Sequence, residues 1–336
     1  MAGSQAVIEI RQLFQLADFE EVLHLQQAIW GFPDIELLPL RFLVVVNSVG
    51  GHVFGAYDGD MMVGFCFAIP GVKRGGQPYL HSHMLGVLPA YRDAHVGRSL
   101  KLKQREEALA RGIQLIEWTF DPLELKNAFF NIERLGAIVR RYHENQYGIT
   151  FSPLHGGLPT DRCYAEWWIA SPRVEAILGR PATSPPAPMV RPSEAISRTS
   201  DTETAVGRPA TSPPDPLARP SQAIGHPSDI EAAVGRTPPS APAPLVRPYE
   251  AITHPSDIEA AVGRTPTSPP DPMARPSQAI AYPADIARIR TEDPRRARQI
   301  QKENGEKFRH AFEQGLAVTR FERGDRESSY LLEPWK

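Results

Sequence analysis

Residues 85–98 combine three features that favour phosphate binding: the end of a strand, a glycine-containing loop and the start of a helix. An apolar run from Tyr79 to Val87 is typical of a strand, and Pro89 ends it. A helical run rich in Lys, Arg and Glu begins at Gly97. Unpaired backbone N–H groups and the positive end of the helix dipole then point to one spot, where a phosphate binds well. The alternative is a strand–turn–helix without a ligand.

The elements that position this loop follow from the periodicity of apolar residues along 1–170. Two apolar runs joined by Asp58-Gly59-Asp60 predict a β-hairpin, because Asp-Gly adopts the tight turn that joins antiparallel strands. Gly112 and Gly136 end the helices that precede the next two strands. The expected strands are 7–10, 52–57, 61–69, 79–87, 113–120, 137–142 and 163–170, and the expected helices are 17–29, 39–46, 97–111 and 122–135.

The loop resembles the acyl-CoA loop of the GNAT superfamily of acyl-CoA N-acyltransferases, whose signature is Arg/Gln-x-x-Gly-x-Gly/Ala. Arg92 and Gly97 match this signature, and His95 stands where its first glycine is expected. The order of elements over nearly all of 1–170 also resembles the GNAT order. The resemblance implies an α/β (α+β) fold with a mixed, mostly antiparallel central sheet flanked by helices. It also implies acetyl-CoA or another acyl-CoA as co-substrate, without a metal.

Three further segments resemble a bacterial subgroup of predicted GNAT proteins that carry an extra C-terminal helix and strands. They are Trp118–Pro122, Leu135–Tyr142 and Leu158–Arg162. In GNAT folds the fourth and fifth strands splay apart, and the thioester enters the gap between them. The resemblance therefore implies that the thioester carbonyl binds a backbone N–H within 85–87 and that the pyrophosphate binds the N–H groups of 93–98.

The basic residues Arg98, Lys101 and Lys103 are expected near the outer phosphates of CoA, the alternative being a solvated helix face. Asn127 and Asn131, on the helix after the fifth strand, are expected to bind the pantetheine arm. The predicted cofactor-binding residues are Leu85, Gly86, Val87, Arg92, Asp93, Ala94, His95, Val96, Gly97, Arg98, Asn127 and Asn131.

Transfer of an acyl group to an amine requires a base for the ammonium and stabilisation of the leaving thiolate. His81 and His83 alternate along the fourth strand, so they share a face, and a histidine pKa lies near working pH. Glu117 and Asp121 lie on or just after the fifth strand, across the splay. We predict His83, Asp121 and Glu117 as catalytic candidates. A satisfied core histidine is the alternative for His83.

The residue that would protonate the leaving thiolate differs from the usual one in GNAT proteins. GNAT proteins often use a tyrosine on the helix after the fifth strand, and the alignment at Leu135–Ala137 puts Ile132 at its position. Tyr142 is the predicted catalytic substitute, with Tyr147 or a thiolate that leaves without a donor as alternatives.

Three arginines give a clue to the substrate. Arg140, Arg141 and Arg162 are predicted substrate-binding residues, because a guanidinium matches a carboxylate well. That chemistry suits an amino acid as acceptor or a dicarboxylic acyl group such as succinyl. The alternative is that these arginines lie exposed on strands without a ligand.

Between 179 and 282 the sequence repeats with a period of 28 residues. Gly-Arg recurs at 179, 207, 235 and 263, and Ala-Ile recurs at 195, 223, 251 and 279. Each unit is rich in proline and poor in apolar residues, so it buries too little surface to offset its ordering entropy. We expect 171–282 to be a disordered, semi-extended linker inserted into a surface connection. A ligand for a polyproline-binding module is the alternative.

The last segment, 283–336, predicts a helix over 284–314, broken at Pro294, and a hairpin over 316–322 and 329–332. About fifty residues with this small core are not expected to fold alone. We therefore expect them to dock on the first domain, which spans 1–170, and to form one composite fold with it.

Composition excludes several function classes. The net charge of -2 gives no reason to expect nucleic acid or an anionic membrane as partner, and no run is apolar enough for a membrane span or signal peptide. Two cysteines suit a reducing, cytoplasmic compartment. We predict an N-acyltransferase that moves an acetyl or other short acyl group directly to the primary amine of a small molecule in a ternary complex. The alternative is a degenerate GNAT-fold binding or scaffold protein, and homodimerisation is left open.

Overall fold

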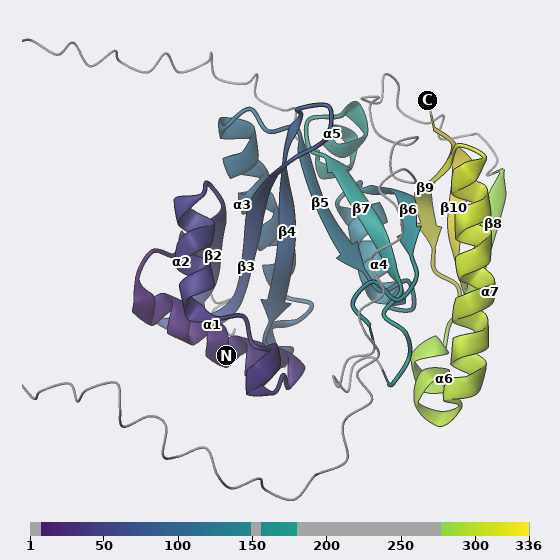
Figure 1. Cartoon of the computed structure of the whole chain (residues 1–336), viewed down its shortest axis with the longest axis horizontal. Coiled ribbons are helices and arrows are strands. Elements are labelled where there is room, and N and C mark those ends of the chain that lie inside the picture. Colours follow the sequence, from purple (N-terminus) through teal and green to yellow (C-terminus); the bar gives the residue numbers. More distant parts are fainter. Residues whose placement is uncertain (1–7, 149–155, 180–276, 336) are drawn as a thin grey trace, which may run out of the picture. The chain divides into compact units, whose positions relative to one another are not determined.

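The computed structural model describes residues 8–148, 156–179 and 277–335. They form a ten-stranded sheet in the order β1-β2-β3-β4-β5-β7-β6-β9-β10-β8 (Figure 1). Every neighbouring pair is antiparallel except β4 and β5, which are parallel, so the expected mixed, mostly antiparallel sheet flanked by helices is confirmed. The strands are β1 (Glu9–Gln12), β2 (His52–Asp58), β3 (Met61–Val72), β4 (Pro78–Val87), β5 (Leu115–Phe120), β6 (Ile138–His143), β7 (Arg162–Trp168), β8 (Gln278–Pro283), β9 (Leu316–Glu322) and β10 (Glu327–Pro334).

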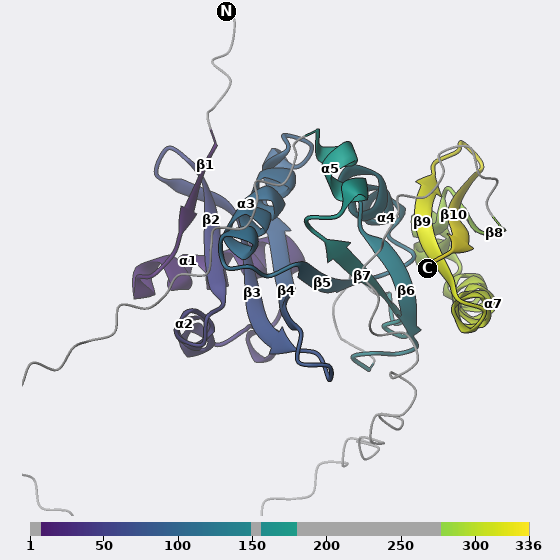
Figure 2. The ribbon, with the colours of Figure 1, turned by 90° about the horizontal axis from the view of Figure 1, so that it is seen from above.

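Helices cover both faces of the sheet (Figure 2). On β2, alternate residues point to opposite sides: Val53 packs with α1 and α2, and Phe54 packs with α3. The helices on the α3 side bury a second core against β5 and β7, centred on Trp118 and Trp167, whose rings meet edge to face. The helices are α1 (Leu16–Trp30), α2 (Leu40–Ser48), α3 (Val96–Ala110), α4 (Leu125–Phe129), α5 (Pro172–Leu178), α6 (Ile286–Glu292) and α7 (Pro294–Glu313), with short turns η1 (Asp34–Glu36), η2 (Pro89–Tyr91) and η3 (Phe130–Arg134).

Strands β4 and β5 separate soon after they meet. Their register contains only Leu80 opposite Ile116 and His81 opposite Glu117, although both strands continue beyond these pairs. On its other edge β4 carries a bulge, because its pairing with β3 passes from Ser82 directly to Met84. A bulge bends the strand that carries it. The β4–β5 splay therefore lies next to this bend.

The segment after β5 differs from the single helix expected over 122–135. It begins with a turn, continues as α4 and ends in η3, which is a π-helix. The N–H of Leu135 donates to the carbonyl of Phe130, five residues earlier, at 3.1 Å. A π-turn displaces the helix surface locally and is frequent near functional sites. Here it brings Phe130, Glu133 and Arg134 to the side that faces the end of β4.

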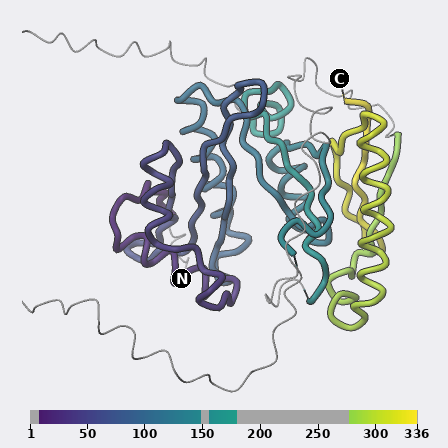
Figure 3. The backbone as a smooth tube through the Cα atoms, in the orientation of Figure 1, coloured from purple at the N-terminus to yellow at the C-terminus, as the bar shows by residue number. Residues whose placement is uncertain are grey.

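The C-terminal elements extend the same sheet (Figure 3). Val318 of β9 pairs with Val139 of β6, and α7 packs across β6, β8 and β9. The helix expected over 284–314 is divided into α6 and α7, because Asp293 caps a new helix at Pro294. All of α5 and all but the last residue of β8 lie inside the range 171–282 that was predicted as linker. Most of the repeat lies outside the described residues. No described helix is long and apolar enough to cross a bilayer.

Candidate functional site

A pocket of about 780 Å³ opens where β4 ends, beside the N-terminus of α3. Its walls come from β4, the loop 91–95, the first turn of α3, α4, η3 and Ile177 of α5. Most of the residues predicted to bind cofactor line it; the exceptions are Gly86, Ala94 and Asn131. The structure therefore gathers the predicted loop and Asn127 of the next helix around one cavity.

Two residues of the loop adopt the left-handed backbone conformation. Asp93 has φ 68° and His95 has φ 61°. For a residue with a Cβ this conformation costs about 1–2 kcal/mol, so glycine usually occupies such positions. His95 therefore has the backbone conformation that a glycine at this signature position would adopt easily. It is also the N-cap of α3 and makes no side-chain capping bond, which leaves the helix N-terminus available to a ligand.

The charge of the pocket suits an anion. Its lining side chains include four basic groups and two carboxylates, namely Arg92, Arg98, Lys126 and Arg134 against Asp93 and Glu133. This surplus of positive charge lies at a helix N-terminus, where phosphate groups bind well. Lys126, Arg134 and Ile177 were not predicted from the sequence. Basic residues on the helix after β5 were the signal that could have pointed to the first two.

Gly86, Ala94 and Asn131 lie near the pocket without lining it. A Cβ on Gly86 would come within 2.8 Å of the Trp30 ring, so a glycine here permits α1 to pack closely. Ala94 is exposed in the loop. Asn131 is 2% exposed, and its Nδ2 has no hydrogen-bond partner within the described part of the chain.

His81 and His83 lie on the sheet face that carries α1 and α2. Their ring centroids are 5.8 Å apart, and the His83 ring lies 5.3 Å from that of Phe67, which belongs to the α1–α2 core. Desolvation lowers the pKa of His81 to about 4 and lowers the pKa of His83 from its ordinary value. Both imidazoles are thus held neutral near pH 7. His83 is exposed, whereas His81 is half-buried.

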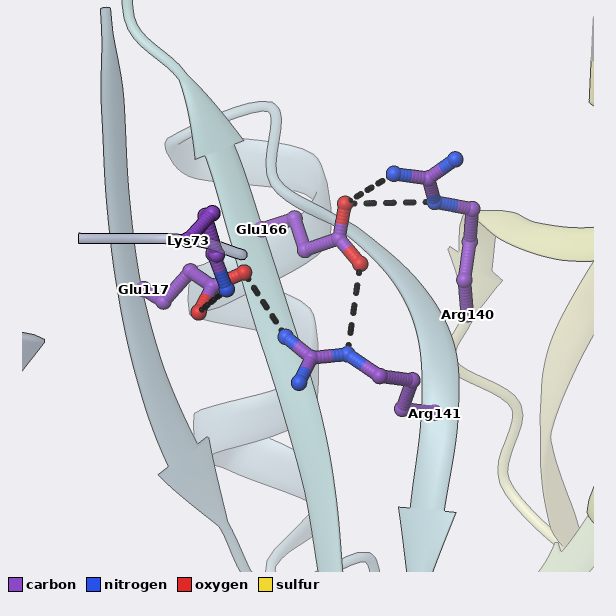
Figure 4. A network of polar contacts seen from close by, with 5 residues as sticks. All are labelled: Lys73, Glu117, Arg140, Arg141 and Glu166. Carbon is purple, nitrogen blue, oxygen red and sulfur yellow. Dashed lines mark hydrogen bonds and ion pairs between the residues drawn. The ribbon is translucent and has the colours of Figure 1, made fainter. Parts of the chain in front are cut away.

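Five charged side chains form a continuous network across β5, β6 and β7 (Figure 4). Lys73 Nζ lies 2.5 Å from Glu117 Oε2, and Arg141 Nη2 lies 2.7 Å from Glu117 Oε1. Glu166 accepts from Arg140 at 2.5 Å and lies 3.6 Å from Arg141. Glu117 and Glu166 are each 3% exposed. Both oxygens of Glu117 are therefore ion-paired, and the network has one more cation than anion.

A bulge in β6 makes this network possible. The pairing of β6 with β7 passes from Val139 opposite Ala165 to Arg141 opposite Tyr164, so Arg140 is the extra residue. Consecutive strand residues normally point to opposite faces. With the bulge, Arg140 and Arg141 both reach Glu166. The two predicted substrate-binding arginines thus lie together, and each is already paired with a carboxylate.

The other predicted residues lie away from the pocket. Asp121 lies 3.5 Å from Arg290 of α6, and burial raises its pKa to about 6. The Tyr142 hydroxyl donates to Asp161 at 2.5 Å, and its ring stacks on Phe308 of α7. Burial raises the pKa of Tyr142. Arg162 is 9% exposed and donates to the backbone carbonyl of Asp161.

Lys101 and Lys103 differ sharply although both lie on α3. Lys103 is half-buried and pairs with the exposed Glu106 one turn along, as on a solvated helix face. Lys101 is 3% exposed and points into the protein. Ile132, which stands where the resemblance to GNAT proteins would place a tyrosine, is fully buried in the core. Among the described residues no group of His, Cys, Asp and Glu side chains could hold a metal ion.

No family model and no curated protein matches the chain. Solved structures do resemble it. A protein of the GNAT family from Desulfovibrio desulfuricans is 16% identical, with a TM-score of 0.41 over 49% of this chain and 100% of its own. The ribosomal-protein-S18-alanine N-acetyltransferase from Escherichia coli is 18% identical, with a TM-score of 0.39 over 49% of this chain and 96% of its own.

A third similar structure is yncA from Salmonella typhimurium with its cofactor acetyl-CoA, which is 18% identical with a TM-score of 0.39. The aligned residues span 94% of the yncA chain and 48% of this chain.

Proposed function

We propose that the chain binds an acyl-CoA in the pocket at the end of β4 and transfers the acyl group to the primary amine of a small molecule. The observation that carries this proposal is the splay of β4 from β5 beside a cation-lined pocket at the N-terminus of α3. A diphosphate suits the helix terminus and the loop N–H groups. The narrow pantetheine arm, which ends in the thioester, suits a gap between two strands, because the backbone groups of the separated strand edges can bind its amides.

The two faces of the sheet suit two substrates. The pocket is lined by residues of α3, α4 and α5, whereas His81 and His83 lie on the face that carries α1 and α2. An acyl-CoA that enters from the first face would present its carbonyl through the splay to an amine on the second. This arrangement supports direct transfer in a ternary complex, because neither substrate has to leave before the other binds.

We assign the base to His83. Its lowered pKa keeps the imidazole neutral at pH 7, so it can accept a proton from an acceptor ammonium directly or through one water. Glu117 is less suited, because Lys73 and Arg141 occupy both of its oxygens. Tyr142 and Asp121 are engaged in contacts with α7 and α6. These pairings favour structural roles for the three other predicted catalytic residues.

The acceptor we favour carries a carboxylate as well as an amine. The network of Lys73, Arg140 and Arg141 with two glutamates has a surplus positive charge on the same sheet face as His83, since Glu117 stands opposite His81 in the register. A partly buried surplus cation favours an anionic ligand. An amino acid acceptor meets this requirement, and so does the acyl group of a dicarboxylic acyl-CoA.

The test is turnover of acetyl- and succinyl-CoA with a panel of amines, in pairs that differ only by a carboxylate or its amide. We expect transfer with the carboxylate member and a weaker rate with the amide. The variant His83→Gln is expected to lose turnover while it still gains thermal stability from CoA. CoA binding without turnover of any pair would favour the alternative, a GNAT-fold binding protein. The buried Ile132, which stands in place of an acidic hydroxyl, is the observation that supports this alternative.

A further inference from the structure

Lys101 of α3 lies where β4 and β5 begin to separate. Its Nζ donates to Ser82 Oγ at 2.8 Å and lies 3.6 Å above the centroid of the Trp118 ring. The last β4–β5 pair joins His81 to Glu117. Ser82 and Trp118 are therefore the first residues beyond the pairing on their strands, and the ammonium bridges them at the base of the splay.

The pocket wall lies one turn of α3 from this ammonium. Gly97, which lines the pocket, precedes Lys101 by four residues and so lies one turn away on the same face of α3. Opposite Gly97 is Leu85 of β4, whose side chain would lie 3.5 Å from a Cβ at Gly97. Along α3, the chain passes from Gly97 at the pocket to Lys101 at the base of the splay. Along β4, the same path runs from Leu85 to Ser82.

The Lys101 ammonium contacts Ser82 and the Trp118 ring, and both of these partners are uncharged. Lys101 is 3% exposed, and no ion pair of it occurs within the described residues. Desolvation lowers its pKa to about 7. Burial of an unpaired cation destabilises a fold, and an apolar side chain of similar length would pack against Trp118 at lower cost. A charged group kept at such a cost one helical turn from a pocket is a candidate for function.

We propose that Lys101 is the acid that protonates the leaving CoA thiolate, an assignment that rests on the proposed function. The neutral acceptor amine bonds to the thioester carbon, and the C–S bond breaks with its electron pair on sulfur. The nitrogen releases one proton to solvent as the amide forms, and the Lys101 ammonium gives the sulfur a proton. CoA leaves as the thiol, and the neutral amine of Lys101 regains a proton from solvent. This role replaces the hydroxyl that Ile132 does not provide.

The groups around Lys101 do not change charge between pH 6 and 9. They are Cys66 of β3, His52 of β2 and His81 of β4, beside the uncharged Ser82, Gln104 and Trp118. Burial raises the pKa of Cys66 to about 12 and lowers those of His52 and His81 to about 3 and 4. Lys101 is therefore the group at the base of the splay whose charge is lost as the pH rises through 7.

The experiment compares wild-type chain, Lys101→Met, Lys101→Arg and, as a matched control, Lys302→Met on the exposed side of α7. Three quantities are measured: the melting temperature, its rise with acetyl-CoA, and the rate of acyl-CoA turnover from pH 6 to pH 9. We expect Lys101→Met to melt at or above the wild-type temperature and to keep the rise with acetyl-CoA. Its turnover should fall about 10²–10⁴-fold, the usual contribution of a positioned acid.

The pH dependence separates acid catalysis from a structural role. The wild-type rate should decline above pH 7 as the ammonium loses its proton, Lys101→Met should lack this decline, and Lys302→Met should match wild type. Lys101→Arg, which keeps its charge, should shift the decline to higher pH. Wild-type turnover in Lys101→Met, or parallel loss of stability, acetyl-CoA binding and turnover, would overturn the assignment. A wild-type chain that binds acetyl-CoA and never turns it over would count against the proposed function and, with it, against this role.

Discussion

Glu117 offers the sharpest test of the buried network, through the substitution Glu117→Gln. The side chain is 3% exposed, and its two oxygens pair with Lys73 at 2.5 Å and with Arg141 at 2.7 Å. Gln keeps the shape and removes the charge, so both cations lose a buried partner. Breaking a buried ion pair by removing one member costs about 3–5 kcal/mol. For a folded unit of this size each kcal/mol lowers the melting temperature by roughly 2–4 °C, so a fall of roughly 6–20 °C is expected.

The matched control is Glu106→Gln, because Glu106 forms an exposed pair with Lys103 on α3. Such pairs contribute about 0–1 kcal/mol. Thermal unfolding of both variants gives the comparison, and the double variant Lys73→Met/Glu117→Gln adds a second. Because Met removes one of the two cations that Glu117→Gln leaves without its carboxylate, the double variant should be more stable than Glu117→Gln alone. Equal melting temperatures for the two single variants would refute the reasoning, as would a double variant that is less stable than Glu117→Gln.

Three further predictions concern the repeats, the C-terminal segment and the histidines His52 and His81. Deletion of residues 180–263, which are three whole units or 84 residues, should leave the melting temperature and its rise with acetyl-CoA unchanged; a large loss of stability would show that the repeats pack. A fragment of residues 1–180 should be insoluble or unresponsive to CoA, because β6 loses its contact with β9, and a soluble fragment that binds acetyl-CoA would contradict this. Below pH 6.5 the unfolded chain binds protons at His52 and His81 and the folded chain does not, since their pKa values are lowered to about 3 and 4. The free energy of unfolding in urea should therefore fall between pH 6.5 and pH 4 by up to about 1.4 kcal/mol per pH unit and histidine, whereas equal values at pH 7 and pH 5 would contradict it.

Local patterns in the sequence were enough to predict most of the elements within residues 8–148. Alternation and Asp58-Gly59-Asp60 predicted the β2–β3 hairpin, and the loop before α3 was predicted within a residue of the observed helix start. These features depend on short-range rules of turn chemistry and periodicity. The segment after β5 was predicted less well. A π-helix satisfies its bonds five residues apart, and no local composition distinguishes it from an α-helix.

The chemistry of the sheet faces depended on two bulges that no local pattern signals. The bulges beside His83 and at Arg140 change which side chains share a face, so the alternation rule fails at these two positions. Lys101 was expected near the outer phosphates of CoA, with a solvated helix face as the alternative, and the packing of α3 against Trp118 buries it instead. Its burial depends on which face of α3 meets the sheet. That is a tertiary property, and the Lys- and Arg-rich helix sequence does not reveal it.

Binding of acetyl-CoA to the full chain tests the central claim most directly. The claim is that the cation-lined pocket at the N-terminus of α3 holds an acyl-CoA. A ligand that binds only the folded state at about 100 times its dissociation constant stabilises it by about 2.7 kcal/mol. The melting temperature should then rise by roughly 5–11 °C, at 2–4 °C per kcal/mol. An Arg98→Glu variant should lose most of that rise. No rise with acetyl-CoA, succinyl-CoA or free CoA would contradict the account.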